Sequence, residues 1–167
     1  MADESSDDQL QQQAWSRLNK IRFVLLTTRD SSGRLSSRPM TLQQSEFDST
    51  LWFFASRSTN FVDDLSQQAQ VNVSCMDAAD SFYLSISGRA MVVDDQVRAR
   101  SLWSAMNEAW FPQGPTDPDL ALLRVDVERA ELWKSDTNRM VQMLRIAKAA
   151  AFGTPPRGVG EHVVLKS

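Results

Sequence analysis

The sequence lacks the short motifs that mark the commonest cofactor and metal sites. It contains no GxGxxG dinucleotide fingerprint, no phosphate-binding P-loop, no CxxC pair and no HExxH. Its single histidine, His162, stands near the C-terminus without partners at metal-ligand spacing. A Ser-His-Asp triad would depend on the same histidine. We therefore predict no metal site and no triad.

Cysteine, basic charge and long apolar runs are also scarce. The one cysteine, Cys75, cannot form an internal disulfide, and its apolar context VNVSCM predicts a buried small side chain. The net charge of −3 argues against a nucleic-acid partner, which would require a basic face. No apolar run approaches the roughly 18 residues of a membrane helix. The start MADESSDDQ is acidic and unlike an export signal, so we expect a cytoplasmic protein without a membrane partner.

What is present is typical of one globular domain. The 167 residues are 42% hydrophobic and 23% charged, which suffices for a single sizeable core. We expect residues 1–8 to form a disordered acidic lead, residues 9–152 to form the domain, and residues 153–167 to form a loop-like tail.

Apolar periodicity and turn signals predict mostly strands. A period of two, or a short apolar run, predicts strands over residues 22–28, 34–43, 51–56, 71–76, 82–93 and 120–135. A helical period predicts helices over residues 8–21, 61–69, 95–109 and 136–151. Because strands and helices do not alternate regularly, a parallel sheet is disfavoured. The pattern favours a small antiparallel barrel with flanking helices.

The segment 51–65 is the most informative for function. An apolar strand ends at Ser56, and a polar loop containing Arg57, Thr59 and Asn60 then opens a predicted helix. A helix N-terminus with hydroxyl, amide and guanidinium groups could hold a phosphate. The alternative is an ordinary helix cap, in which Asn60 accepts a hydrogen bond from the backbone N–H of Asp63.

Four further residues are candidates for a ligand site or a partner surface. Arg38 precedes Pro39 in a strand, where it needs either an anionic or carbonyl partner or a surface salt bridge. Trp110 and Phe111 lie in a loop rich in Pro and Gly and are interpreted as an exposed apolar pair for a partner or ligand. Trp133 either belongs to the core or forms a wall for a planar ligand.

Five segments together resemble a known family. They are RPM (38–40), LWFFAS followed by Thr59 and DDL (51–65), YLSISGRA (83–90), LWSAMNEAWFPQGPTDP (102–118) and AELW (130–133). From about Trp15 to about Arg139, the chain resembles the general-stress-protein branch of the pyridoxamine 5′-phosphate oxidase-like FMN-binding split barrels. The resemblance implies a mainly β (α+β) fold, a six-stranded antiparallel split β-barrel with flanking helices. It also implies a homodimer with FMN at its interface.

The resemblance also assigns roles to residues of this chain. The isoalloxazine and ribityl chain would lie along β-strand residues 38–40, and the backbone of residues 53–56 would contact the polar edge of the ring. Thr59 and Asn60 match phosphate-contacting positions, and two tryptophans would come from the partner subunit. The implied cofactor-binding residues are Arg38, Pro39, Met40, Phe53, Phe54, Ala55, Ser56, Arg57, Thr59, Asn60, Trp110 and Trp133. Since a flavin carries hydride chemistry itself, no catalytic residue is predicted.

The chain departs from the family pattern at two places. Phe61 stands where the family usually has a lysine or arginine, and Arg57 or Arg38 would have to replace that cation. Val141 and Met143 stand where true vitamin B6 oxidases have a histidine and an arginine, although Trp133 is kept. The B6 oxidase activity is therefore disfavoured, and the substrate is unknown.

Three functions remain open at this point. The first is an FMN-dependent oxidoreductase, and the second is a flavin-binding stress or storage protein without a dedicated substrate. The third is a dimeric interaction module that has lost its ligand.

Overall fold

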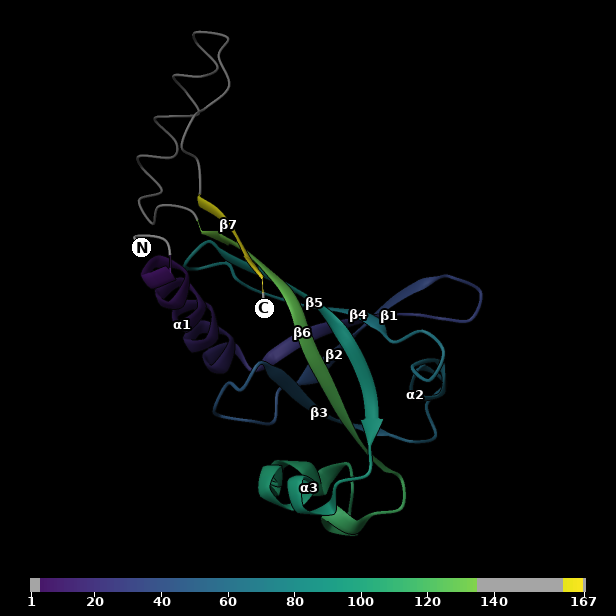
Figure 1. The fold of residues 1–167 in the computed structure, drawn as a ribbon. Coiled ribbons are helices and arrows are strands. Elements are labelled where there is room, and N and C mark those ends of the chain that lie inside the picture. Colours follow the sequence, from purple (N-terminus) through teal and green to yellow (C-terminus); the bar gives the residue numbers. More distant parts are fainter. Residues whose placement is uncertain (1–3, 135–160, 167) are drawn as a thin grey trace, which may run out of the picture.

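Seven antiparallel strands form one strongly curved sheet in the computed structural model, which describes residues 4–134 and 161–166 (Figure 1). The strand order is β2-β1-β4-β5-β6-β3, and β7 pairs with β6 beside this path. The strands are β1 (Phe23–Arg29), β2 (Leu35–Thr41), β3 (Thr50–Ser56), β4 (Gln70–Asp77), β5 (Phe82–Val93), β6 (Leu120–Lys134) and β7 (Glu161–Lys166). The six strands of the path agree with the predicted split-barrel fold.

One long helix and several short ones flank the sheet. They are α1 (Glu4–Ile21), α2 (Asn60–Asp64) and α3 (Gln96–Leu102), together with the 3-10 helices η1 (Ala105–Ala109) and η2 (Gly114–Thr116). Helix α1 lies along one side of the sheet, whereas α3 lies at its opposite end (Figure 1). The long N-terminal helix covers part of the main core through Ala14 and Leu18, which are buried.

Strand β3 is buried on both faces and divides the apolar residues into two clusters. Leu51, Phe53 and Ala55 point into the main core of the barrel. Trp52 and Phe54 point the other way, into a second cluster that α3 and the loop after it complete. Alternate side chains of a strand lie on opposite faces, so a continuous apolar run such as LWFFA suits this position.

Strand β6 is long enough to pair with two strands on the same edge. Its first half pairs with β3, from Leu120↔Ser56 to Asp126↔Thr50, and its second half pairs with β7. Along its other edge it pairs with β5, with one irregularity between Ser87 and Gly88. This arrangement leaves β2 and β3 at the two ends of the sheet path, where the barrel is split.

Three predictions about the elements were wrong. Helix α1 begins at Glu4 rather than near residue 8, because acidic side chains favour the first turn of a helix. The expected helix over 95–109 ends at Leu102, and the backbone of Trp103 is extended. The expected loop-like tail contains β7, which occupies the edge of β6 that β3 leaves open. The predicted helix over 136–151 lies outside the described residues.

Candidate functional site

The β1–β2 hairpin fixes the position of Arg38. Its turn is held by Asp30, whose Oδ1 accepts hydrogen bonds from the backbone N–H groups of Ser32 and Arg34, each at 2.9 Å. Hydrogen bonds from Ser32 and Arg34 hold the pKa of the Asp30 carboxyl well below its usual range. The resulting register pairs Arg38 with Leu26.

Arg38 is half-buried and lies between β1 and α2. Its Nη1 donates a hydrogen bond of 2.8 Å to Oγ1 of the buried Thr28, and its Cζ lies 4.1 Å from the centre of the Phe61 ring. Burial lowers the pKa of the guanidinium, and the Asp64 carboxylate acts in the opposite direction. Arg38 therefore lies against a hydroxyl and an aromatic face in the described part of the chain, and not in a surface salt bridge.

Arg38 and Pro39 lie on opposite faces of β2. Arg38 and Met40 are half-buried, and Met40 packs against the main core. Pro39 is exposed on the outer face, because side chains alternate along a strand. The three consecutive residues of the RPM motif thus do not line a single surface.

The outer edge of β3 is partly closed by the side chain of Gln44 and the backbone of Gln43. The buried Gln44 donates from Nε2 to the Thr50 carbonyl at 2.6 Å and accepts the Trp52 N–H at 2.8 Å. The Gln43 N–H donates to the Trp52 carbonyl at 3.0 Å. Backbone groups alternate in direction along a strand, so those of Phe54 also point away from β6. The side chains of Phe53, Phe54 and Ala55 are buried, which leaves only their backbone for contact with a ligand.

The loop after β3 is held by Asp119. Its carboxylate accepts hydrogen bonds from Oγ of Ser56 at 2.6 Å and from the backbone N–H of Ser58 at 3.1 Å. These bonds hold the pKa of Asp119 below its ordinary value. Arg57 donates from Nε to the Leu120 carbonyl at 2.9 Å, and its backbone N–H donates to the Asp119 carbonyl at 2.7 Å. A carboxylate thus already occupies this part of the loop.

The interpretation of Asn60 as a helix cap was wrong. Helix α2 begins at Asn60, and its N-cap is Thr59, which forms no side-chain cap hydrogen bond. Instead, Oγ1 of Thr59 donates to the Ser56 carbonyl at 2.7 Å, which tightens the loop. Asn60 is exposed at the start of a helix of only five residues.

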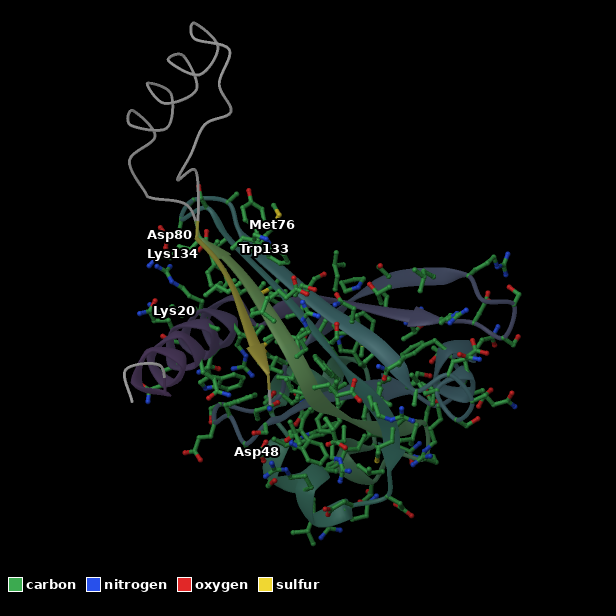
Figure 2. All side chains as sticks on the ribbon, turned by 45° about the horizontal axis from the view of Figure 1, so that its top comes forward. Lys20, Asp48, Met76, Asp80, Trp133 and Lys134 are labelled. Carbon is green, nitrogen blue, oxygen red and sulfur yellow. The ribbon has the colours of Figure 1, made fainter. Side chains whose placement is uncertain are left out.

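Trp133 shares an apolar surface with Pro39. The two residues line one depression on the outer face of the sheet, and the side chains around it come from β1, β4 and β5. Figure 2 shows Trp133 and Met76 near the same end of the sheet. We call this surface the outer apolar face; its largest exposed members are Phe23, Leu25, Pro39, Met76, Tyr83 and Trp133.

Trp110 lies elsewhere, and its neighbour is not exposed. Trp110 follows η1, beside α3, and is 79% exposed. Phe111 is only 6% exposed and packs in the second cluster, with its ring 6.5 Å from that of Trp103. The prediction of an exposed Trp110–Phe111 pair was therefore wrong. Within one chain, Trp110 ends η1, whereas Trp133 lies in the part of β6 that pairs with β7. Helix α3 and strand β7 lie at opposite ends of the sheet (Figure 1).

Cys75 is half-buried, and burial raises the pKa of its thiol to about 11, which disfavours the reactive thiolate.

No group of three or more His, Cys, Asp or Glu side chains suited to a metal ion occurs among the described residues. No helix in residues 4–134 has the length and apolar character needed to span a membrane. Arg139, Val141 and Met143 lie outside the described residues.

Comparison with known proteins decides the family. The family model described as "Pyridoxamine 5'-phosphate oxidase like" matches residues 9–156. The chain belongs to the pyridoxamine 5′-phosphate oxidase-like family. The chain is also 29% identical over 150 residues to Protein bli-3 of Neurospora crassa. The matched region covers 84% of this chain and 72% of that protein.

Two solved structures agree with this family assignment. The general stress FMN/FAD binding protein from Xanthomonas citri is 31% identical, with 77% of this chain and 91% of that chain covered and a TM-score of 0.69. A general stress protein 26 from Jannaschia sp. CCS1 covers 96% of this chain and 99% of its own, with a TM-score of 0.71 at 24% identity. The latter likeness supports the split-barrel fold of this family.

Sequence reasoning missed three residues that shape the site. Thr28 holds Arg38, Gln44 closes part of the β3 edge, and Asp119 orders the loop after β3. A signal for Thr28 lies in the hairpin register. Arg38 pairs directly with Leu26, and Thr28 lies two positions further along β1 on the same face. The contacts of Gln44 are with Thr50 and Trp52, six and eight positions away, and no motif marks them. Those of Asp119 are with Ser56 and Ser58, more than 60 positions away.

Proposed function

We propose that the protein is an FMN-binding flavoprotein of the general-stress type, with flavin bound between two copies of the chain. The observation that carries the proposal is the position of Arg38, half-buried on β2 and stacked on Phe61 beside the loop that follows β3. The Xanthomonas citri relative, which is named an FMN/FAD binding protein, supports a flavin as the ligand.

The residues at this end of the barrel suit the ring of a flavin. The outward backbone groups of β3 offer both donors and acceptors to the polar edge of an isoalloxazine. Arg38 presents further N–H donors, because its one side-chain hydrogen bond among residues 4–134 and 161–166 runs from Nη1 to Thr28. On the outer apolar face, Trp133 is 38% exposed and offers an aromatic surface against which a planar ring from the partner's site could pack.

The chemistry would be that of the cofactor, since bound FMN supplies hydride transfer. The residues of this chain would bind and orient the ring, and none is assigned as an acid or base. Oxidoreductase activity is part of the proposal, and storage of flavin is the second candidate. Mixing the flavin-loaded protein with NADH or NADPH separates them: bleaching of the flavin absorbance indicates an enzyme, and no bleaching favours storage.

Titration with FMN tests the proposed ligand. We expect quenching of flavin fluorescence that saturates near one FMN per chain. The interaction should be visible at tens of micromolar protein, the scale that corresponds to roughly 7 kcal/mol. If no quenching is observed at that concentration, the protein is not a flavoprotein and the proposal fails.

The outer apolar face supports the proposed homodimer. Its six named side chains are exposed in a single chain, on adjacent strands. Leu25 lies on this face between Pro39 of β2 and Ser74 of β4. A patch of this kind commonly marks a protein interface, and a two-fold dimer pairs the same patch with itself. Trp133 and Pro39 belong to this face, so each copy would bring them to the other.

We expect the protein to scatter light with a mass near twice 18.8 kDa at micromolar concentration. Leu25→Arg should yield monomers, because it places one charge from each chain in the buried interface. Val97→Arg is the matched control, since Val97 is an exposed apolar residue on α3, outside this face. A wild-type mass near 18.8 kDa would show that the outer apolar face does not form a dimer.

A further inference from the structure

We propose that the flavin site recognises the ring and the ribityl chain and discriminates little between FMN and riboflavin. This inference rests on the proposed flavin function and concerns the end of the site where the terminal phosphate would lie. It follows from the donors and charges around the loop 56–60, which are largely committed to contacts within the chain.

The loop uses its own hydrogen-bond donors. Thr59 Oγ1 donates to the Ser56 carbonyl at 2.7 Å, and Ser56 Oγ donates to Asp119 at 2.6 Å. The Ser58 N–H is bound to Asp119, and Nε of Arg57 is bound to the Leu120 carbonyl. A phosphate would have to displace these bonds, and it would then lie close to the Asp119 carboxylate, which repels it.

The charge around this loop is balanced between two arginines, Arg38 and Arg57, and two carboxylates, Asp64 and Asp119. Arg38 is the cation that faces α2, and the Asp64 carboxylate lies close enough to act on it. Asp119 adds a second negative charge on the other side of the loop. Neighbouring carboxylates offset the attraction that an isolated arginine would exert on a dianionic phosphate.

Phe61 replaces a possible donor with an apolar ring. The Cζ atom of Arg38 lies 4.1 Å from the centre of the Phe61 ring. The ring therefore orients the guanidinium by a cation–π contact but offers no N–H group of its own. An ordered arginine with free donors suits the neutral hydroxyl and carbonyl groups of a ribityl chain or ring, which both FMN and riboflavin possess.

The test compares FMN with riboflavin on the intact protein by fluorescence titration. We expect dissociation constants that differ by less than about tenfold, since one charge-assisted hydrogen bond to phosphate is worth about ten- to a hundredfold. A preference for FMN of tenfold or more overturns this inference and leaves the flavin function standing. If neither flavin binds, the proposed function itself fails.

Two variants test the charge argument directly. Phe61→Lys should raise the preference for FMN over riboflavin by at least about tenfold, whereas the neutral Phe61→Leu should leave the ratio unchanged. Asp64→Asn should raise the same ratio a few-fold, and Asp63→Asn is its control because Asp63 is exposed. The ratio of two ligands on one variant does not depend on partial loss of folding. An unchanged ratio in both Phe61→Lys and Asp64→Asn contradicts the inference.

Discussion

Replacing Gly88 with alanine is expected to lower the free energy of unfolding by about 3 kcal/mol. A Cβ at this position would lie 2.3 Å from the backbone carbonyl oxygen of Asp126 and 3.1 Å from Cγ1 of Val125. Backbone atoms of β6 cannot rotate away as a side-chain end can, so the β5–β6 pairing must shift. Chemical denaturation measures the difference.

The sign of this effect is what makes the experiment decisive. In an unstrained strand, Gly→Ala commonly stabilises a protein by about 0.4–1 kcal/mol, because it restricts the unfolded chain. Gly114→Ala is the control: no atom lies within 4 Å, but φ is +78°, so a cost of about 1–2 kcal/mol is expected. If Gly88→Ala unfolds at the same denaturant concentration as the wild type, the close approach of β5 to β6 is not a constraint on the fold.

The strands could be predicted from the sequence because the barrel buries them in simple patterns. The alternating burial of β5 produces a period of two, and burial of β3 on both faces produces the run LWFFA. Position 88 was not predicted, since the glycine is required by the close approach of the Asp126 carbonyl on β6, next to the bulge between Ser87 and Gly88. A bulge depends on the partner strand and has no signature within its own segment.

The errors of prediction arose where distant residues pack. The apolar spacing of 95–109 favoured one helix, but Trp103 leaves that helix, and its ring packs 5.7 Å from Phe54 of β3. The same cluster buries Phe111, so only Trp110 of the pair is exposed. Strand β7 was missed because its partner, the second half of β6, lies more than 25 positions away in the sequence.

The candidate site could be predicted only in part. The proline after Arg38 indicated an unusual position in the strand. Arg38 was one of two arginines suggested to replace the cation missing at position 61, and in the structure it lies beside Phe61. The other suggestion, Arg57, is held to the start of β6. That Pro39 and Arg38 lie on opposite faces follows from the alternation of side chains along a strand. Which residues each of them contacts could not be predicted, because those residues come from other strands of the sheet. The roles in flavin binding stay predictions.

Arg38→Ala is expected to weaken the binding of both FMN and riboflavin by about ten- to a hundredfold. The reason is the loss of charge-assisted hydrogen bonds to a partly buried ligand, each worth about 1.5–3 kcal/mol. Both flavins should respond alike, because Arg38 would contact the part they share. The cost to folding should be only about 1 kcal/mol, since among the residues that the structure describes the Arg38 side chain forms one hydrogen bond, to Thr28, and stacks on Phe61.

Two arginine variants serve as controls for this prediction. Arg57→Ala should change the affinity for either flavin less than about threefold, because the Arg57 side chain bonds to the Leu120 carbonyl and its loop lies beside Asp119. Arg34→Ala removes an exposed arginine from the turn of the same hairpin and should leave binding unchanged. Fluorescence titration gives the affinities, and thermal melting confirms that each variant is folded. Equal FMN affinity in wild type and Arg38→Ala, with both proteins folded, would show that Arg38 does not contact the ligand. The site would then have to be sought on another face of the barrel.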